Sequence, residues 1–566
     1  MNFKLIGFLR FIFFGLLAFK YIQIFSSTII LTDYIINTSV LLLIIFSIFS
    51  AIGLFTPFSI LFLILFSSFI EKRIHTYSIA NLIIVLNSIL FLVLGSWRLY
   101  SIDKLFKKSF FLPSKELILY ALRFTIIAYG ISNFGAMVYH LNDITWIKGL
   151  TFKSILLNPY LSNYSSFFEG FNNSILNLIS YSAFIFQTFY QIFLIPLFFI
   201  NRHTKKFVKI YGFFFFACSL IFLNLSFLPH FEIILWILIF YPNKPKNKIH
   251  IFYDERCNLC KRTMFFFKII DVNEKIFFVP SAKINKYYKE KVELTELKNQ
   301  IYIQYKGRTY KGFDSYFLLS KKIPLIIFLS PLFYFLKISK IGYEIYNFIS
   351  INRIKFFGTC EISYDDKLSS LLSNEKINNI NSSFYKKILI FFSFVVFLNL
   401  AIKIPHDNFG FLKSETKYSP INLLTYGIES LGFDIPNVFN DKDLLMGKYF
   451  FNIYYNGNLI SLINEKGERI NQYGNVLKLS NHNSDYLYFQ NSLRLKRYLI
   501  QKHPKEFLED PFIRNQLFEI IKFFKAKNKI KNGNFIIKLF ENNIDLISKD
   551  PFKSSKQLLS QKIIEL

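Results

Sequence analysis

Residues 253–260, Tyr-Asp-Glu-Arg-Cys-Asn-Leu-Cys, decide how the surrounding sequence folds. They follow a predicted strand at 248–252 and precede a predicted helix at 261–270, which contains neither Gly nor Pro. A Cys-x-x-Cys pair therefore stands where a strand turns into a helix N-terminus, and the helix dipole and unpaired N–H groups there favour a thiolate. We predict that Cys257 is the attacking nucleophile and that Cys260, one helical turn later, resolves the mixed disulfide.

The alternatives for this pair are a zinc half-site and an inert pair of thiols. A structural zinc ion takes four ligands, usually including a second Cys or His pair at fixed spacing. Only His250 and Cys360 lie in the same predicted module. Redox chemistry is therefore favoured over metal binding, and no metal is expected. Cys360 is interpreted as a bystander thiol, with a role as a third exchange partner as the alternative.

Asp254 precedes Cys257 by three residues, at the end of the predicted strand. As a catalytic residue it would take or deliver the proton of Cys260 during resolution. As a structural residue it would only cap the helix, a position at which Asp is favoured. The sequence supports the two roles equally. The carboxylate raises the pKa of Cys257, whereas the neighbouring Arg256 lowers it.

Composition places the chain among membrane proteins with two or more domains. It has 566 residues, of which 52% are hydrophobic, and a mean hydropathy of +0.34. Its net charge is +30, but the lysines cluster between apolar segments and in the C-terminal third, so they indicate topology and solvated surface rather than nucleic-acid binding. Four cysteines are too few for a secreted protein stabilised by disulfides.

Residues 1–242 are predicted to form a multispanning membrane domain. Apolar runs of about twenty residues are long enough to cross a bilayer, and about eight are expected, near 5–25, 28–51, 54–70, 79–97, 117–137, 174–200, 207–224 and 227–241. Lys and Arg concentrate on the side that holds the N-terminus, which the positive-inside rule assigns to the cytoplasm. We therefore predict a multi-pass protein of a bacterial inner (cytoplasmic) membrane.

A soluble α/β module is predicted at 248–365, after a polar linker at 243–247. An even number of spans places this module, with its Cys-x-x-Cys pair, in the cytoplasm. The strand-helix-strand-helix-hairpin-helix order is that of a thioredoxin-like fold. Beyond the first strand and helix, the predicted elements are a strand at 275–279, a helix at 290–298, a hairpin at 300–310, a helix from Phe313, and a helical pair at 324–350 broken at Pro331.

The C-terminal part is predicted to begin with one further transmembrane helix at 386–403. Residues 404–566 would then form an extracytoplasmic α+β region. An alternating stretch at 448–463 with turns at 456–457 and 466–467 favours strands, and a basic region at 490–528 favours helix. The region contains no catalytic constellation, so an adapter or lid role is expected.

The module resembles the DCC family over residues 249–361. This thioredoxin-like group is named for Asp-x-x-Cys-x-x-Cys, here Asp254, Cys257 and Cys260. The match further includes Tyr253, Arg262, Asp271, Gly307, Gly312 and the stretch from Tyr346 to Arg353. The resemblance implies thiol-disulfide oxidoreductase activity. Residues 296–300 lack the cis-proline that thioredoxin-fold enzymes usually place before the strand facing the cysteines, so substrate docking is expected to differ.

Residues 1–242 resemble the membrane domain of vitamin K-dependent γ-carboxylases, the horizontally transferred transmembrane domain. The resemblance rests on Gly-Leu-Phe-Thr at 53–56, Tyr-Ser-Ile-Asp at 100–103, Trp-Ile-Lys-Gly at 146–149 and Leu-Ser-Phe at 225–227. The carboxylases have a catalytic lysine a few residues before that Trp, and residues 137–142 contain none. Carboxylation is therefore not expected. His140 is interpreted as a structural hydrogen-bonding residue, with a role as the base as the alternative.

Together these features predict a membrane-bound thiol-disulfide oxidoreductase. The expected partners are the lipid bilayer and a protein or small-molecule thiol or disulfide. No cofactor is expected besides the redox-active disulfide; a quinone-like molecule held by the membrane domain is a less favoured electron acceptor. The alternative is a non-enzymatic membrane scaffold, or a peptide-maturation or transport factor, with a redox-sensing cysteine pair.

Overall fold

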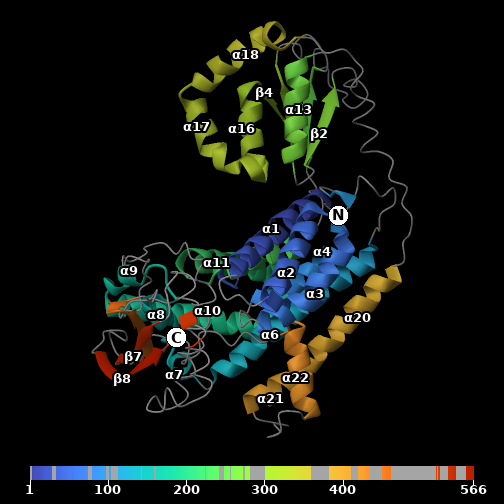
Figure 1. Ribbon diagram of the computed structural model, residues 1–566. Helices are drawn as coiled ribbons and strands as arrows, with labels where there is room; N and C mark the ends of the chain where they lie inside the picture. The colour runs from blue at the N-terminus through green and yellow to red at the C-terminus, as the bar shows by residue number, and fades with distance from the viewer. Residues whose placement is uncertain are drawn as a thin grey trace. The chain divides into compact units, whose positions relative to one another are not determined.

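The computed structural model groups the chain into two compact units (Figure 1). One unit contains Met1–Arg10, Gly95–Leu112 and Tyr241–Ile380, and the other contains Phe11–Leu94, Pro113–Phe240 and Asn381–Leu566. The structure describes residues 3–28, 34–73, 80–96, 101–103, 113–141, 143–158, 161–223, 225–240, 248–254, 257–271, 275–280, 300–358, 382–409, 419–433, 449–459, 518, 521–522, 533–542 and 556–565. These residues are mostly helical.

The first unit holds the α/β module, which is built on a mixed sheet. Its strands are β1 (Ile249–Tyr253), β2 (Ile276–Pro280), β3 (Tyr302–Tyr305) and β4 (Arg308–Lys311), in the order β2-β1-β3-β4. β1 is parallel to β2, and β3 is antiparallel to both β1 and β4. The predicted strands at 248–252 and 275–279 and the hairpin are thus present. The predicted helix at 290–298 lies outside the described residues.

Alternation along the strands gives the sheet two packed faces. Ile251 faces one cluster and its neighbour Phe252 the other, as the two-residue period of a strand requires. The first cluster joins Ile251 to Met264 and Phe267 of α13 (Asn258–Ile270) and to Leu319 of α16 (Phe313–Lys322). Each such burial contributes about 1.5–3 kcal/mol, so the sheet fixes α13 on its face.

Asp271 closes α13 and connects it to the next strand. It is the C-cap residue of the helix, and its Oδ2 accepts the backbone N–H of Ile276 at 2.7 Å. This bond connects the end of α13 to the start of β2 through one buried carboxylate.

The helical pair expected at 324–350 has its break elsewhere. Its elements are a 3-10 turn η4 (Pro324–Leu329), α17 (Ser330–Ile338) and α18 (Ile341–Phe357). The break lies at Ser339 and Lys340, and Lys340 has a positive φ of 62°. Pro331 does not interrupt the pair, because it stands in the first turn of α17, where a helix needs no backbone N–H donor.

The second unit is a helical assembly whose helices coincide with the predicted apolar runs. They are α1 (Phe3–Thr28, which begins in the first unit), α2 (Tyr34–Ile52), α3 (Thr56–Arg73), α4 (Ala80–Val93), α6 (Lys115–His140), α10 (Asn173–Ile200), α11 (Arg202–Phe222) and α12 (Leu228–Phe240). Four stretches in the described ranges are long and apolar enough to cross a membrane: Lys4–Phe25, Lys115–His140, Asn173–Ile200 and Ser383–His406.

Short helices follow α6, in the stretch between the predicted apolar runs at 117–137 and 174–200. They are α7 (Ile144–Ile147), α8 (Thr151–Leu157) and α9 (Ser165–Glu169). His140, at the end of α6, is buried with its ring stacked on Trp146 at a centroid distance of 3.9 Å. Its Nδ1 lies 3.3 Å from Oδ2 of Asp143. These contacts fit the structural role expected for His140.

Ion pairs, one of them buried, tie the helices of this unit together. Lys20 and Glu71 are 2.7 Å apart between Nζ and Oε2, with side chains 4% and 0% exposed, and the Tyr21 hydroxyl donates to Oε1 of the same glutamate at 2.8 Å. A second cluster centres on Glu429, whose carboxylate binds Lys72 and Lys403. Both clusters join residues far apart in sequence.

The predicted helix at 386–403 is part of a longer one. It comprises α20 (Ser382–Leu398), a π-helical turn η6 (Asn399–Lys403) and α21 (Ile404–Phe409), followed by α22 (Pro420–Ser430). The Asn399 side chain donates to the Phe433 carbonyl at 3.2 Å, and Gly432 lies against Ser68 and Val85. Residues 420–433 therefore pack on the helical unit.

The tail contains a second sheet. Its strands are β5 (Tyr449–Tyr455), β6 (Asn458–Leu459), β7 (Asn534–Asn542) and β8 (Lys556–Glu565), in the order β6-β5-β7-β8 with antiparallel neighbours. The predicted turn at 456–457 is confirmed, with φ of 49° at Asn456 and 80° at Gly457. β7 and β8 were not expected. The turn at 466–467 and most of the basic region at 490–528 lie outside the described residues.

Candidate functional site: a cysteine pair at the start of α13

Cys257 stands at the turn between β1 and α13, as the sequence predicts. It is the N-cap residue of α13, with φ −90° and ψ 121°, and its Sγ accepts the backbone N–H of Cys260 at 3.3 Å. A sulfur in this position receives the N–H groups and the dipole of the helix start, which stabilise a negative charge. The local backbone therefore builds a thiolate site.

The pKa values of the two cysteines are driven apart. The hydrogen bond from the Cys260 side chain, joined by the Cys260 backbone N–H and the charge of Arg353, lowers the pKa of Cys257 to about 6 against the opposing effects of burial and Asp254. The pKa of Cys260 is raised, because its proton is shared with Cys257 and because it is buried. Near neutral pH the pair holds one thiolate, on Cys257, and one thiol.

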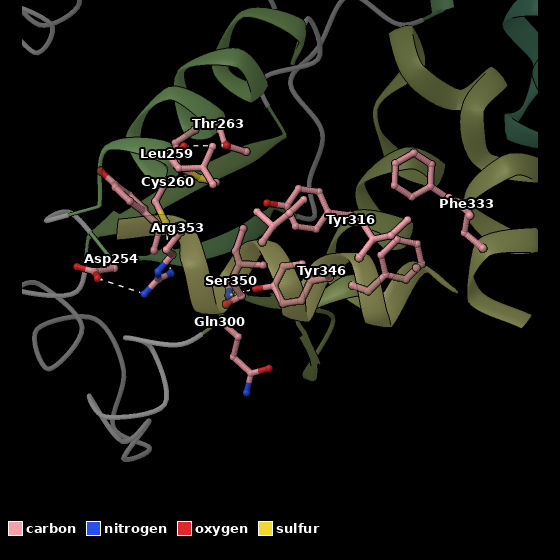
Figure 2. Close-up of a pocket in the computed structure, with 18 residues that line it drawn as sticks. Asp254, Leu259, Cys260, Thr263, Gln300, Tyr316, Phe333, Tyr346, Ser350 and Arg353 are labelled. Carbon is pink, nitrogen blue, oxygen red and sulfur yellow. Dashed lines mark hydrogen bonds and ion pairs between the residues drawn. The ribbon is translucent and has the colours of Figure 1, made fainter. Parts of the chain in front are cut away.

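Arg353 of α18 completes the site from the far end of the module. Its Nη1 lies 3.5 Å from Sγ of Cys260, and its Nη2 lies 3.5 Å from Oδ2 of Asp254. The arginine is 6% exposed, so its charge acts with little screening by solvent. Figure 2 shows Arg353 between Asp254 and the cysteine. From the sequence alone, Arg353 is notable only as the last residue of the stretch that resembles the DCC family, and it has no predicted role.

Asp254 is brought to the site but does not cap the helix. The cap is the sulfur of Cys257, and Asp254 instead pairs with Arg353. The alternative in which Asp254 only caps the helix is therefore wrong. Arg256, which is expected to lower the pKa of Cys257, and Cys360, the bystander thiol, both lie outside the described residues. In the described ranges, no three His, Cys, Asp or Glu side chains gather as metal ligands.

The two sulfurs differ in what they face. Cys257 is 1% exposed. Cys260 is half-buried and lines a cavity of about 380 Å³, which we call the module cavity; Cys257 does not contribute to its lining. A molecule in this cavity would meet the Cys260 sulfur.

The module cavity is enclosed by α13 on one side and by α16, α17 and α18 on the other. Its walls are mainly apolar and aromatic, with Phe313, Tyr316, Phe333 and Tyr346 among them. Burial raises the pKa of Tyr316 and of Tyr346, so both phenols are neutral. In Figure 2, Phe333 lies at the end of the cavity away from Cys260 and Arg353.

Tyr346 also fixes the wall of the cavity to the sheet. Its hydroxyl accepts the backbone N–H of Ile301, just before β3, at 2.9 Å. This bond and the packing of Tyr346 on Tyr316 hold α18, and with it Arg353, against the body of the module.

Comparison with known proteins finds one family match, and it covers this site. Residues 251–359 match the family of DCC1-like thiol-disulfide oxidoreductases, a stretch that includes both cysteines, Asp254 and Arg353. No curated protein and no solved structure matches the chain. The family match supports a redox role for the module.

Proposed function

We propose that the chain is a membrane-bound thiol-disulfide oxidoreductase whose active pair is Cys257 and Cys260. The observation that carries the proposal is the helix-capping sulfur of Cys257, whose pKa of about 6 makes it a thiolate at neutral pH. The family match to residues 251–359 supports the reaction class.

The reaction transfers two electrons from the cysteine pair to a substrate disulfide. The Cys257 thiolate attacks one substrate sulfur, so a mixed disulfide forms and the other substrate sulfur leaves as a thiolate. The Cys260 thiol then loses its proton and attacks the Cys257 sulfur. This step forms the Cys257–Cys260 disulfide and releases the second substrate thiolate. A cytosolic thiol pool returns the pair to the reduced state.

Asp254 and Arg353 support the second step in this proposal. Cys260 must lose a proton that its raised pKa holds firmly, and the Arg353 guanidinium beside its sulfur stabilises the thiolate that forms. The Asp254 carboxylate, held by the same arginine, is the proton acceptor. Asp254 is thus assigned a catalytic role.

The architecture proposed around this site is a thioredoxin-like module at 248–365 between membrane segments. The sheet order β2-β1-β3-β4, with β3 antiparallel to its neighbours, supports the thioredoxin-like assignment. The four apolar helices of membrane length support insertion in a bilayer. Lysine placement assigns the module to the cytoplasmic side of a bacterial inner membrane and residues 404–566 to the opposite side.

A γ-carboxylase-like membrane domain at 1–242 is retained as part of the proposal, without carboxylase activity. Residues 137–142 lack the lysine that is catalytic in the carboxylases. The only base near this position that the sequence suggested, His140, is buried in a stack with Trp146 and bound to Asp143. The membrane domain is therefore assigned to anchoring.

One observation favours a second candidate function, a redox sensor. Cys257 is 1% exposed, and a pair whose attacking sulfur is buried can form a reversible internal disulfide without exchanging with a substrate. Turnover separates the two functions. The purified full chain, in lipid nanodiscs with a thiol reductant, should reduce a fluorogenic peptide disulfide over many cycles, and both Cys257→Ser and Cys260→Ser should stop turnover. Reversible disulfide formation in the wild type without turnover would favour the sensor.

A further inference from the structure

The two sulfurs of the pair differ in their access to the module cavity. Cys260 lines it, whereas Cys257 does not. The proposed exchange with a disulfide substrate uses the Cys257 sulfur. The pair therefore has a second approach, through the cavity to Cys260, that the exchange reaction leaves unused.

The polar groups of the cavity gather at its cysteine end. Arg353, Asp254 and Thr263 lie there with Cys260, and most of the remaining lining is made of Phe, Tyr, Leu, Ile and Met side chains. Gln300 and Ser350 also line the cavity, but Gln300 donates to the Tyr302 hydroxyl at 3.1 Å and Ser350 is hydrogen-bonded to Tyr346. The Thr263 hydroxyl already donates to the Leu259 carbonyl at 2.8 Å, so Arg353 is the group suited to bind a ligand oxygen. The matching ligand has an apolar, ring-shaped body with one electronegative atom directed at the cysteine.

The rim of the cavity is also apolar. Ile345 and Ile349 line the cavity and are 50% and 40% exposed. On the preceding helix, α17, Leu332, Phe335 and Ile338 are 53%, 64% and 64% exposed. A ligand that reaches the cavity along this surface is soluble in lipid rather than in water.

The electron count restricts the ligand further, because the pair of one thiolate and one thiol gives up two electrons and one proton, so its oxidant must accept two electrons. A peptide disulfide would bring backbone amides that need polar partners, and a flavin would bring a polar ring edge and a phosphate. In the described lining the Thr263, Gln300 and Ser350 side chains already make hydrogen bonds within the protein. A quinone needs no more than one donor near one carbonyl. We propose that the module cavity binds a lipid-soluble quinone, which oxidises the cysteine pair through Cys260. This inference rests on the proposed redox cycling of the pair.

The oxidation balances within the cavity. The Cys260 sulfur adds to a carbonyl carbon of the quinone, and the thiol proton moves to that carbonyl oxygen beside Arg353. The Cys257 thiolate then attacks the Cys260 sulfur, so that the S–S bond forms and the C–S bond breaks with its electron pair entering the ring. One proton from solvent completes the hydroquinone. The pair loses two electrons and the ring gains them.

The test uses the full chain in nanodiscs, with Cys218 and Cys360 replaced by Ala so that the pair supplies the only thiols. The reduced protein is mixed without oxygen with a fully substituted benzoquinone that carries a decyl chain, because such a ring cannot be trapped by thiol addition at an open carbon. Hydroquinone formation is followed by absorbance, and disulfide formation by mass spectrometry. We expect one hydroquinone and one Cys257–Cys260 disulfide for each chain.

A matched pair of variants places the reaction in the cavity. Ile349→Trp fills the cavity and should slow hydroquinone formation at least ten-fold, whereas Ile351→Trp, at a side chain 82% exposed on the same helix, should leave it unchanged. Both variants should reduce a water-soluble peptide disulfide at the wild-type rate, which also shows that they are folded.

Other outcomes separate this inference from the proposed function. Equal quinone reduction by both variants, or none by the wild type while peptide disulfides still turn over, overturns the quinone site and leaves the exchange activity standing. Loss of peptide turnover in Ile349→Trp together with quinone turnover assigns the cavity to the peptide and overturns the inference. Absence of both reactions in the wild type removes the proposed function itself.

Discussion

Nη1 of Arg353 lies 3.5 Å from the sulfur of Cys260, although 93 residues separate the two in the chain. The arginine lowers the pKa of both cysteines and also holds Asp254. One side chain thus connects the thiolate, the thiol and the carboxylate of the candidate site.

Removal of this charge should weaken the thiolate. In Arg353→Gln the pKa of Cys257 rises, because a positive charge that stabilised the thiolate is lost. Peptide-disulfide reduction at pH 7 should fall roughly two-fold, because a pKa rise of about one unit from about 6 lowers the thiolate fraction from about 90% to about 50%. The matched control is Arg262→Gln, at an exposed arginine of α13. An unchanged rate in Arg353→Gln would show that the helix start alone sets the thiolate.

The pH dependence of alkylation should distinguish the two cysteines. A thiol with a pKa of about 6, as for Cys257, is about 90% thiolate at pH 7, whereas one with the ordinary value near 8.5 is about 3% thiolate. Because the thiolate is the reactive form, alkylation of Cys257 should rise through pH 6 and level off before pH 8. Mass spectrometry of the full chain resolves the sites. In Cys257→Ser, modification of Cys260 should require alkaline pH; a Cys257 profile centred near pH 8.5 or above would contradict the thiolate assignment.

Tyr346 should control the attachment of α18 to the sheet. Tyr346→Phe removes the acceptor of the Ile301 N–H, and a buried donor without a partner costs about 1–3 kcal/mol. Hydrogen exchange in the peptide that contains Ile301 should become roughly ten-fold faster. Tyr334→Phe is the control, since that side chain is 54% exposed. Equal exchange in the two variants would mean that the Tyr346 hydroxyl contributes nothing to the contact.

The buried Lys20–Glu71 pair should be sensitive to the loss of one partner. Glu71→Gln leaves the Lys20 charge in a site 4% exposed, and such a change costs about 3–5 kcal/mol. The double variant Lys20→Met/Glu71→Met should be less destabilised than the single one, because no charge remains buried. The temperature at which half of the detergent-solubilised chain aggregates measures both, with Glu116→Gln, at an exposed position, as control. A single variant as stable as the control would argue against the pair.

Membrane orientation follows from reporter fusions after Lys248 and after Phe409, the last residue of α21. We expect a cytoplasmic response at the first site and an extracytoplasmic one at the second, because the lysines concentrate on the cytoplasmic side. An extracytoplasmic response after Lys248 would place the cysteine pair on the other side of the membrane.

Local sequence patterns predicted much of this structure, and contacts between distant residues explain the rest. The strand-to-helix turn at Cys257, the hairpin at Gly307 and the apolar helices follow from short-range periodicity and turn chemistry. The predicted helix break at Pro331 is wrong because proline is found at the starts of helices as well as beyond their ends. β7 was not predicted because its pairing partner β5 is distant in the chain, and β8 pairs in turn with β7. Arg353 received no role for the same reason, since no spacing rule relates residues 93 apart.

The distance in sequence between Cys260 and Arg353 has a consequence for synthesis of the protein. The chain emerges from the ribosome N-terminus first, so the cysteine pair is made 93 residues before the arginine that borders it. At roughly 5–20 residues per second, the pair is exposed for about 5–20 s without that positive charge. During this interval Cys257 is a weaker nucleophile than in the finished module. The nascent chain is therefore less prone to premature disulfide cross-linking to other thiols. Cys257 becomes fully reactive only when α18 has been synthesised.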